Sequence, residues 1–598
     1  MKEYTAPLRD MHFVLRELTP LEEVARLPGC EDATREVTEA ILTEAGKFAS
    51  GVLSPLNRVG DREGARWRDG EVTTAPGWRD AYRQFVEAGW NALSCDPEHG
   101  GQGLPRLVSA LVDEMWNGAN VAFALCPMLT RGAIEAIELR GSEALRRTYL
   151  PKLVSGEWTG TMVLTEPQAG SDLASVRTRA VPQGDGTYKL EGQKIFITYG
   201  EHDLAENIVH LVLARTPDAP EGVKGISLFV VPKFLPKEGG GLGARNDVRC
   251  VSIEHKLGIH GSPTAVLAFG DQGGAVGWLV GEEHRGLEYM FIMMNAARFA
   301  VGLEGIGISE RAYQRALDYA RERLQGTELG ARSRERVAIV RHPDVRRMLM
   351  LMKSRTEAMR ALACAVAAAT DTARRHPDAA RRQERQAFVD LMIPVVKGWA
   401  TEMAVENASL GVQIHGGMGY VEETGAAQHL RDARITPIYE GTTGIQAADL
   451  IGRKIARDRG AAAAALIREV REVEGQLGRR DSALLAAIGA RLHEGLAALE
   501  RATEFVVGTY GPDVRRPSVG AVPFLDLLGT VAGGWQMARA ALVAHQRLGE
   551  GAGEAGFYRA KLATARFYAD HVLARAPGLA LTVVEGAEGA LAIEDDQL

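Results

Sequence analysis

The chain contains few cysteines for its length, and they form none of the patterns that staple small folds or bind metals. Its 598 residues include five cysteines, an odd number, and no two of them form a C-x-x-C pair. Scattered cysteines argue against a disulfide framework and against a zinc site, and they favour a reducing compartment. We therefore expect no metal centre and a cytoplasmic location.

Long apolar runs and an excess of basic residues are missing as well. The alanine-rich run at residues 361–370 is too short to cross a bilayer, which takes about 20 apolar residues. Residues 1–15 place charged residues among the apolar ones, unlike a signal peptide. The net charge of −7 provides no attraction to nucleic acid. These absences predict no membrane partner and no nucleic-acid partner.

The spacing of apolar residues divides the chain into five predicted domains. Residues 1–35 are a short N-terminal extension, and residues 36–160 have the spacing of a helical domain. Residues 161–280 hold short β-rich runs between Gly, Pro and Asp turns, which predicts an antiparallel β-barrel or sandwich. Residues 281–457 predict a four-helix bundle, and residues 458–598 predict an additional C-terminal helical domain. The fold class is therefore α+β.

The expected strands and bundle helices follow from the same spacing. Short β-rich runs of three to seven residues indicate strands, and longer runs with helical periodicity indicate helices. The β-rich runs are 160–164, 188–190, 195–198, 208–214, 226–231, 248–253 and 265–269. The long helical runs are 287–324, 343–376, 384–411 and 444–457.

A segment with candidate ligand-binding groups occupies residues 161–172 and reads TMVLTEPQAGSD. A short apolar strand leads into a loop whose backbone amides and hydroxyl groups, at Thr165 and Ser171, suit a polar heteroaromatic ring or a phosphate. A strand-exit loop with Asx and Ser turns accounts for the same residues without any ligand. The strand end at residues 196–198 has the same two interpretations, a ligand contact or core packing.

A second segment with such groups lies between Gln413 and Gly444. The glycines at residues 416–419 allow a planar or phosphorylated ligand to approach the backbone, although a helix C-cap would also use glycine there. A helix is expected to start near Ile445, and its N-terminal amides are a candidate anion site. Glu440 precedes that helix between apolar neighbours, so it is a candidate base if its cleft is partly dry. An acid that meets the helix dipole is the alternative.

Together these segments resemble the acyl-CoA dehydrogenase family over about residues 35–455. The shared motifs, in the family's order, are LTEPxAGSD at residues 164–172, QIHGGxGY at residues 413–420 and IYEGT at residues 438–442. The family has a helical domain, a β-barrel and a four-helix bundle in this order. The opening YTAPLRDM at residues 4–11 and the helical extension after residue 460 resemble the longer bacterial branch of the family.

The resemblance implies a bound FAD whose flavin ring lies between barrel and bundle. Arg323 and Gln325 match an Arg-x-Gln-Phe-Gly element that reaches the FAD of a neighbouring subunit, although the Phe is missing here. The cofactor contacts implied in the barrel are Met162, Leu164, Thr165, Gly170, Ser171, Phe196, Ile197 and Thr198. The further contacts implied are Gln413, His415, Gly416 and Gly417 for the adenine or pyrophosphate, and Thr442 and Gly444 for the phosphates.

The resemblance also implies the reaction. Glu440 removes the α-proton of an acyl-CoA thioester while the β-hydrogen leaves as hydride to flavin N5, and the product is a trans-2-enoyl-CoA. The electrons pass to electron-transferring flavoprotein. Asn295, which replaces the family's Asp, is an implied substrate contact together with Ser171, Arg298 and Gly441. A homodimer is expected, because the C-terminal extension would occupy a face that shorter relatives use for tetramer contacts.

Three alternatives remain open. An acyl-CoA oxidase, with dioxygen as acceptor, would carry the same motifs. A DNA-associated flavoprotein of the alkylation-response type would need a basic C-terminal domain, whereas residues 461–598 contain 14 Lys and Arg against 17 Asp and Glu. A catalytically silent homologue would not need Glu440 and both flavin loops.

Overall fold

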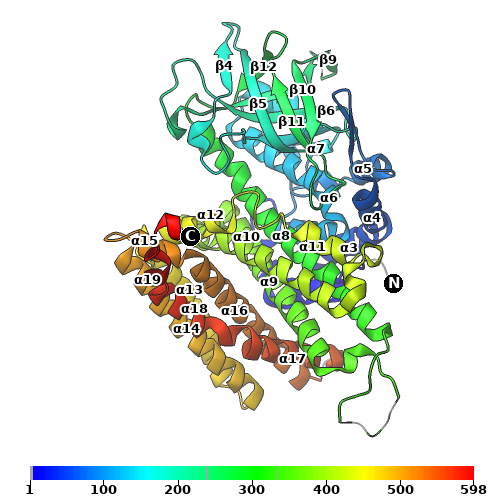
Figure 1. Ribbon diagram of the computed structural model, residues 1–598, viewed down its shortest axis with the longest axis vertical. Helices are drawn as coiled ribbons and strands as arrows, with labels where there is room; N and C mark the ends of the chain where they lie inside the picture. Colours follow the sequence, from blue (N-terminus) through cyan, green and yellow to red (C-terminus); the bar gives the residue numbers. More distant parts are fainter. Residues whose placement is uncertain (1–3, 238–239, 331, 333–334, 552) are drawn as a thin grey trace. The chain divides into compact units, whose positions relative to one another are not determined.

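The computed structural model is rich in helices and holds one large β-sheet, which confirms the predicted α+β fold class (Figure 1). It describes residues 4–237, 240–330, 332, 335–551 and 553–598. The chain divides into two units, and each is assembled from separate stretches. Unit 1 contains Met1–Gly46, Pro105–Gly118 and Val301–Leu598, and unit 2 contains Lys47–Leu104 and Ala119–Ala300. The five predicted domains divide the sequence into consecutive segments, whereas each packed unit combines distant parts of the chain. The two divisions therefore do not correspond one to one.

Unit 2 is built on an eight-stranded sheet with the order β10–β11–β5–β12–β7–β6–β3, and β4 pairs with β5. Every residue of β6 and β7 is buried, so both faces of the sheet are covered there. The strands are β3 (Trp158–Val163), β4 (Arg179–Pro182), β5 (Tyr188–Thr198), β6 (Asn207–Ala214), β7 (Ser227–Pro232), β10 (Val248–Ile253), β11 (Thr264–Phe269) and β12 (Ala275–Leu279). Two hairpins stand apart from it: β1 (Arg66–Arg68) with β2 (Glu71–Thr73), and β8 (Phe234–Pro236) with β9 (Leu242–Arg245).

The sheet is mostly antiparallel, as predicted, with one exception. Strands β3 and β6 run parallel, with Trp158 opposite Asn207 and Val163 opposite Val212. A parallel pair needs a long connection between its strands, and here β4 and β5 intervene in the sequence. The prediction of a purely antiparallel barrel was wrong at this pair.

All seven predicted β-rich runs overlap strands to within one residue, but two of them belong to one strand. The runs 188–190 and 195–198 are joined in β5 because Lys194, a charged residue between them, is fully buried in an ion pair with Glu166. Strands β4 and β12 were not predicted. Each is short, and β4 has one buried residue among its four, so its apolar pattern is weak.

The helices of unit 2 pack aromatic side chains against one another. The rings of Trp78 and Phe123 meet edge to face with their centroids 5.6 Å apart. Helix α6 (Arg106–Arg140) contributes Phe123 after a break at Asn120, whose backbone leaves helical geometry and whose Oδ1 accepts a hydrogen bond from the Phe123 amide. The other helices are η2 (Ala49–Leu53), α4 (Ser54–Glu63), α5 (Trp78–Glu87), η3 (Trp90–Ala92), η4 (Pro97–His99), α7 (Glu143–Ser155), η5 (Leu173–Ser175) and η6 (Val223–Gly225).

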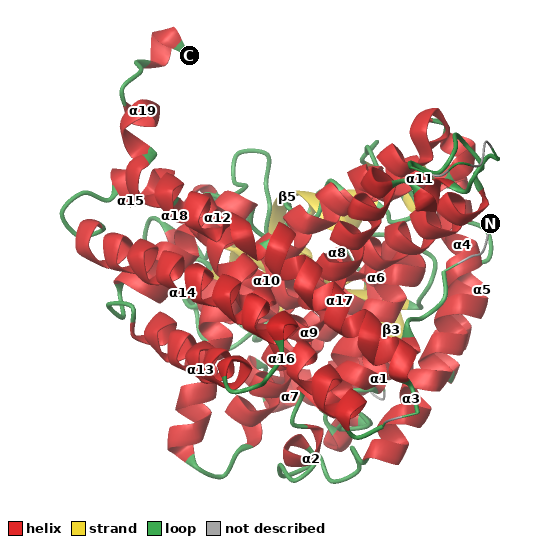
Figure 2. Cartoon of the chain, turned by 90° about the horizontal axis from the view of Figure 1, so that it is seen from below, coloured by secondary structure: helices red, strands yellow, loops and turns green. Residues whose placement is uncertain are grey.

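The elements named for the described residues of unit 1 are all helices, which are red in Figure 2. The four predicted bundle helices are present as α8 (Gly286–Glu322, which enters unit 1 at Val301), α9 (Pro343–Arg375), α10 (Ala379–His415) and α12 (Thr443–Asp449) with its continuation η10 (Leu450–Ala456). The shorter elements between them are η7 (Ile339–Arg341), η8 (Gly416–Tyr420), η9 (Glu422–Thr424) and α11 (Ala426–Ala433).

The C-terminal helices share a core with the bundle. Helix α16 packs against α9, α10 and α12, and the α10 residue Trp399 is buried against it. A Cβ at Gly529 of α16 would stand 2.3 Å from the Trp399 ring, so only glycine permits this approach. The helices of this region are α13 (Ala461–Gly478), α14 (Ala483–Thr509), α15 (Arg515–Val519), α16 (Ala521–Gly549), α17 (Ala555–His571), η11 (Leu573–Arg575), α18 (Ala576–Glu585), α19 (Ala587–Leu591) and η12 (Asp595–Gln597).

Helix α8 is the one element of the described chain that is long and apolar enough to cross a membrane, which the sequence analysis did not anticipate. Its most apolar window has a mean hydropathy of 1.3, and 67% of that window is buried inside the protein. The core helix of a globular protein has the same length and composition.

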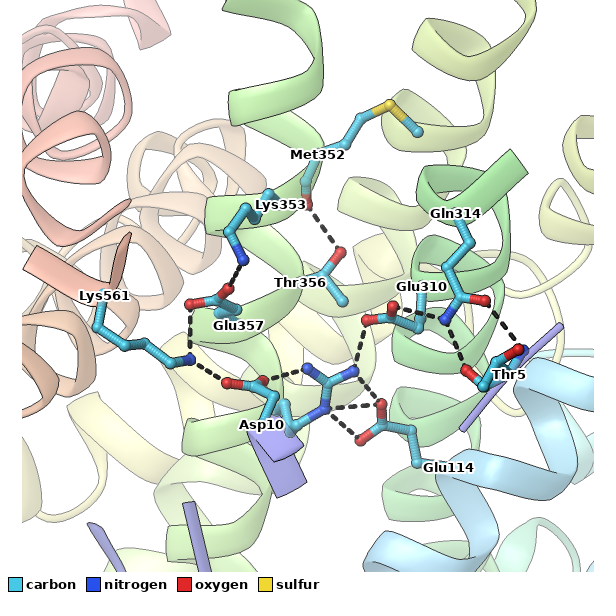
Figure 3. Close-up of polar contacts among 11 residues, drawn as sticks. Thr5, Asp10, Glu114, Glu310, Gln314, Met352, Lys353, Thr356, Glu357 and Lys561 are labelled. Carbon is cyan, nitrogen blue, oxygen red and sulfur yellow. Dashed lines mark hydrogen bonds and ion pairs between the residues drawn. The ribbon is translucent and has the colours of Figure 1, made fainter. Parts of the chain in front are cut away.

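The N-terminal segment is anchored in unit 1 rather than appended to it. Its elements are α1 (Leu8–Phe13), η1 (Val14–Leu18), α2 (Leu21–Val24) and α3 (Arg35–Phe48), and Met11 and Leu15 are fully buried. Asp10 joins a buried network of charges that Figure 3 shows in close-up. Its carboxylate pairs with Arg360 of α9 and with Lys561 of α17. One aspartate thus ties the first helix to the bundle and to the C-terminal helices.

Candidate active site

Glu440 lies in the turn that leads from α11 to α12, and its side chain is half-buried. Its backbone has a φ of +54°, a conformation that residues with a side chain rarely adopt. Gly441 follows with a φ of +86°. Two successive left-handed residues make a sharp turn, and non-glycine residues held in this way occur most often at functional sites.

Side chains from two helices hold this turn through its backbone. Lys397 of α10 is fully buried, and its Nζ donates to the carbonyl oxygen of Gly441 at 2.7 Å. The Nε2 of Gln446 in α12 donates to the carbonyl oxygen of Glu440 at 3.1 Å. The Oγ1 of Thr443 donates to Glu402 Oε1 at 2.6 Å. The conformation of Glu440 is therefore imposed by its surroundings.

A second carboxyl group stands beside the turn. Glu304 of α8 is fully buried, and its Oε2 accepts a hydrogen bond from the hydroxyl of Tyr439. Burial raises the pKa of Glu304 to about 8, the Tyr439 hydroxyl opposes that rise, and the charge of Glu440 adds to it. The two carboxyl groups thus interact electrostatically, and Glu304 is mostly protonated near neutral pH.

Thr442 and Gly444 form the start of α12. Thr442 is the N-cap, and its Oγ1 accepts a hydrogen bond from the Ile445 amide at 3.2 Å. This bond occupies the Thr442 hydroxyl with the protein's own backbone. Gly444 is exposed, as expected for an amide that meets a ligand phosphate.

The QIHGG segment ends α10. The helix stops at His415, and Gly416 continues with a φ of +61°, which requires glycine. Gln413, Gly416 and Gly417 are exposed, whereas the His415 ring is buried and stacks on Tyr319 with centroids 4.3 Å apart. The His415 Nδ1 donates to the Gly411 carbonyl at 2.7 Å, and burial lowers its pKa, so the ring is neutral. His415 therefore supports the turn from inside the protein.

Arg323 and Gln325 are exposed beyond the end of α8. The backbone of both residues is fixed, because the Ile339 amide donates to the Arg323 carbonyl at 2.8 Å and the Gln325 amide donates to the Val337 carbonyl at 3.0 Å. Their side chains can therefore reach a group outside the described chain from a defined position.

In unit 2 the LTEP loop is built around a buried ion pair that the sequence analysis did not identify. Glu166 and Lys194 are almost completely buried and lie 2.9 Å apart. Burial opposes ionisation of Glu166, but Lys194 and the hydrogen bonds from Thr178 and the Arg177 amide outweigh it and lower its pKa to about 2. The pair could have been suspected from the charged residue inside an apolar strand pattern at β5.

This ion pair brings two of the predicted cofactor segments together. Lys194 also donates to the carbonyl oxygen of Leu164 at 2.9 Å, and the amide of Ile195 donates to the carbonyl of Thr165 at 2.9 Å. Met162, Leu164 and Thr165 are half-buried, and Gly170 and Ser171 are exposed in the loop beyond them.

Phe196 is held in an unusual position at a β-bulge. The pairing of β5 with β11 shifts between Lys194 and Ile197, and Phe196 within the shift has a φ of +60°. Its aromatic side chain is 59% exposed. The neighbouring Ile197 is buried in the barrel core, so only its backbone is available to a ligand, and Thr198 is half-buried.

The two predicted substrate residues of α8 lie one turn apart but differ in exposure. Asn295 is exposed, whereas Arg298 is buried with its guanidinium 6.0 Å from the centre of the Phe291 ring. Both belong to the part of α8 in unit 2. No group of three or more possible metal ligands occurs in the part of the chain that the structure describes. All five cysteines are free and buried.

These groups fit an isoalloxazine ring and phosphates. Gly170 and Gly417 have no described protein atom within 4 Å of a Cβ built on them, and a Cβ on Gly444 would meet only Thr442 Oγ1 in ordinary contact at 3.7 Å, so packing within the chain does not require glycine at these positions. Glycine at these positions would be required if a ligand approached the backbone closely. The exposed, strained Phe196 provides an aromatic face for a planar ring.

Comparisons with known proteins show the family of the chain. Family models match along the chain: "Acyl-CoA dehydrogenase, N-terminal domain" at residues 35–157, "middle domain" at 161–272, "C-terminal domain" at 284–456, and "Acetyl-CoA dehydrogenase C-terminal like" at 463–594. The 3-methylmercaptopropionyl-CoA dehydrogenase of Ruegeria pomeroyi is 52% identical over 95% of this chain and 96% of its own. The sequence was expected to belong to the longer bacterial branch that includes this enzyme, and the comparison confirms that prediction.

Two solved structures resemble the chain as well. The acyl-CoA dehydrogenase of Bacillus anthracis, solved in complex with FAD, has a TM-score of 0.73 at 22% identity and covers 96% of this chain and 92% of its own. A structure described as the electron transferring flavoprotein of Acidaminococcus fermentans has a TM-score of 0.57 at 28% identity and covers 70% of this chain and 97% of its own. Taken together with the family models, these likenesses place the chain in the acyl-CoA dehydrogenase family of FAD-dependent oxidoreductases.

Proposed function

We propose that the protein removes two hydrogens from the α and β carbons of an acyl-CoA thioester, with Glu440 as the base that takes the α-proton. The observation that carries this proposal is the strained turn of Glu440. A half-buried carboxylate is held there at a φ of +54°. Gln446 donates to the carbonyl oxygen of Glu440 itself, and Lys397 and Glu402 hold the following residues Gly441 and Thr443. Holding a base in a costly backbone conformation is expected where its position matters for a reaction.

The reaction requires a base and hydrogen-bond donors from the chain. An α-proton beside a thioester is weakly acidic, so a base must lie within hydrogen-bond reach, and the enolate oxygen needs donors. Glu440 supplies the carboxylate, and its own backbone N–H is the protein's donor to the enolate oxygen. When bound, FAD supplies the acceptor of the hydride from the β-carbon.

The residues of unit 2 bind and orient the cofactor in this proposal. The hydroxyls and amides of Thr165, Gly170 and Ser171 meet polar edges, and Phe196 packs against the ring. Exposed Gln413, Gly416, Gly417 and Gly444 are placed for the adenine and phosphates, and Arg323 and Gln325 reach a neighbouring subunit's cofactor. Ser171, Asn295, Arg298 and Gly441 remain the proposed substrate contacts.

We propose 3-methylmercaptopropionyl-CoA as the first substrate to test, because the relative that is 52% identical over almost the whole chain carries that name. The acceptor proposed for the electrons is an electron-transferring flavoprotein. A DNA-associated role receives no support from charge, because residues 461–598 contain 14 Lys and Arg against 17 Asp and Glu.

A cytoplasmic homodimer is the proposed assembly, with no membrane and no nucleic acid as partner. The segment that follows the QIHGG motif exposes apolar side chains at Met418, Tyr420 and Val421, and Tyr420 is 90% exposed. Contiguous exposed apolar residues of this kind mark contact surfaces. Light scattering of the purified protein tests this assembly, and a monomer would exclude it.

The experiment that tests the function is turnover of a panel of acyl-CoA thioesters by the purified yellow protein. An artificial acceptor, a purified electron-transferring flavoprotein and dioxygen are compared in separate reactions. Reduction of the first two without oxygen consumption is expected. Fast oxygen consumption would establish the oxidase, and a protein that keeps no flavin would refute the proposal.

A further inference from the structure

The buried carboxyl group of Glu304 is not used by the chemistry proposed above. It lies in the part of α8 that belongs to unit 1, and none of its surface is exposed. Its Oε2 accepts the hydrogen bond of the Tyr439 hydroxyl, one residue before Glu440. Its Oε1 is buried without a hydrogen-bond partner among the described residues. A carboxyl group in this setting is expensive to ionise.

Three groups from two other elements act on Glu304. Tyr439 and Glu440 approach it from the turn before α12, and Lys397 approaches it from α10. Burial is the largest influence and raises the pKa of Glu304 to about 8. The Tyr439 hydroxyl lowers the pKa, the negative charge of Glu440 raises it, and the positive charge of Lys397 has the smallest effect. Lys397 also donates a hydrogen bond to the Gly441 carbonyl at 2.7 Å, so it holds the backbone of the turn as well.

We propose that Glu304 is a positioning residue for the reaction, which anchors Tyr439 through its buried carboxyl oxygen and thereby holds the Glu440 carboxylate in its working orientation without adding a second negative charge. The inference rests on the proposed function of Glu440. It deepens that function by adding a second carboxyl group with a different duty. Glu440 carries the charge and takes the proton, while Glu304 stays neutral and fixes the turn.

Ionisation of Glu304 at high pH is expected to reduce turnover. Ionised Glu304 would place a second negative charge beside the site where the thioester becomes an enolate, and like charges oppose that step. Turnover should therefore fall as Glu304 loses its proton. If only the uncharged form is active, the rate one pH unit above the midpoint is about a tenth of its plateau.

Two variants of Glu304 and one control test the inference. Glu304→Gln keeps an oxygen that accepts the Tyr439 hydrogen bond but cannot ionise. Glu304→Ala removes the acceptor, and a displaced base is expected to lower kcat by about 10- to 100-fold at pH 7. Asp526→Asn is the control, because Asp526 of α16 is a partly buried acid whose pKa is also raised by burial.

The pH profile of kcat separates positioning from a structural role. We expect the wild-type protein to lose activity with a midpoint near pH 8, and Glu304→Gln to keep its activity there. The acidic limb should be the same in both, and Asp526→Asn should follow the wild type throughout. An unchanged alkaline limb in Glu304→Gln would overturn the inference. A shifted acidic limb would also overturn it, because that shift requires a charged Glu304 at neutral pH.

Thermal unfolding against pH provides a readout that needs no substrate. An acid whose pKa is raised on folding stabilises the protein below its unfolded value near 4.5, and this contribution is lost as the pH rises towards 8. Glu304→Gln should therefore have a flatter stability curve than the wild type between pH 5 and pH 8. A curve identical to that of the wild type refutes the uncharged state even if Glu304→Ala does not fold. If no acyl-CoA is turned over while the curve flattens, the proposed function fails and the protonation of Glu304 stands.

Discussion

Removing the guanidinium of Arg360 is the sharpest test of how the N-terminal segment and the bundle are held together. Arg360 is 1% exposed, and its Nε donates to both oxygens of Glu114 at 2.8 and 3.0 Å. Its Nη2 donates to Glu310 at 2.7 Å, and its Nη1 pairs with Asp10 (Figure 3). Arg360→Met keeps a long apolar stem but leaves three buried carboxyl groups without their shared cation.

The expected loss follows from the burial of those partners. Removing one member of a buried, hydrogen-bonded ion pair destabilises a protein by about 3–5 kcal/mol, because the remaining charge has no compensation. At about 1.4 kcal/mol per factor of ten, local opening should become about 10²- to 10³-fold more frequent. Hydrogen exchange of the amides in α1 measures that opening, since Asp10 attaches this helix to the network.

The loss should also depend on pH in a defined direction. Burial already raises the pKa of Glu114 to about 7 in the presence of Arg360. Without the cation its pKa rises further, so the variant gains a contribution that is present at low pH and is lost as the pH increases. Arg360→Met should therefore be closer to the wild type at pH 5 than at pH 8.

A matched control uses an arginine on the surface. Arg381 pairs with Glu384 at 2.8 Å, and both side chains are about half exposed. Arg381→Met should change stability by less than about 1 kcal/mol. If α1 exchanges no faster in Arg360→Met than in Arg381→Met, the reasoning about the buried network is refuted.

Three further predictions concern the site. Lys397→Met should slow turnover and destabilise the protein by about 1.5–3 kcal/mol, because a hydrogen bond from a charged donor is lost. Denaturant unfolding measures this loss, and a variant as stable as the wild type would contradict the prediction. Phe196→Gly should relieve the strained backbone and raise thermal stability by about 0.5–1 kcal/mol while weakening flavin retention; unchanged retention in equilibrium dialysis would oppose the ring contact. Glu166 should add stability above its unfolded pKa near 4.5 that is lost as the pH falls towards 2, and Glu166→Gln should lack this acid dependence in thermal melts.

The arrangement of helices and strands was largely predictable because apolar periodicity records burial. Helices α9 and α10 and strand β10 lie close to their expected bounds. The strand β5 was divided in two because Lys194 interrupts its apolar pattern, and only its partner Glu166, 28 positions earlier in the chain, explains its burial. The parallel pairing of β3 with β6 depends on the path of the connection, which local periodicity does not contain.

The candidate site was predictable from motifs, but its support was not. Glu440 and the glycines near it stand in recognisable local patterns. Glu304 and Lys397 are 136 and 43 positions before Glu440 in the sequence. A charged residue in a helix is ordinarily assigned to the solvated face of that helix. Only the packing of α8 and α10 against the turn places them inside. Long-range burial of charge is the part that a sequence pattern does not record.

The most direct test of the account is a rapid-mixing experiment without oxygen on Glu440→Gln and the wild type, with an acyl-CoA that the wild type turns over. The visible absorbance of the flavin should fall quickly in the wild type. In Glu440→Gln the protein should remain yellow, bind the thioester, and lose absorbance at least about 10²- to 10⁴-fold more slowly, the usual contribution of a positioned base. Loss of absorbance at the wild-type rate in Glu440→Gln would contradict the assignment of Glu440 as the base.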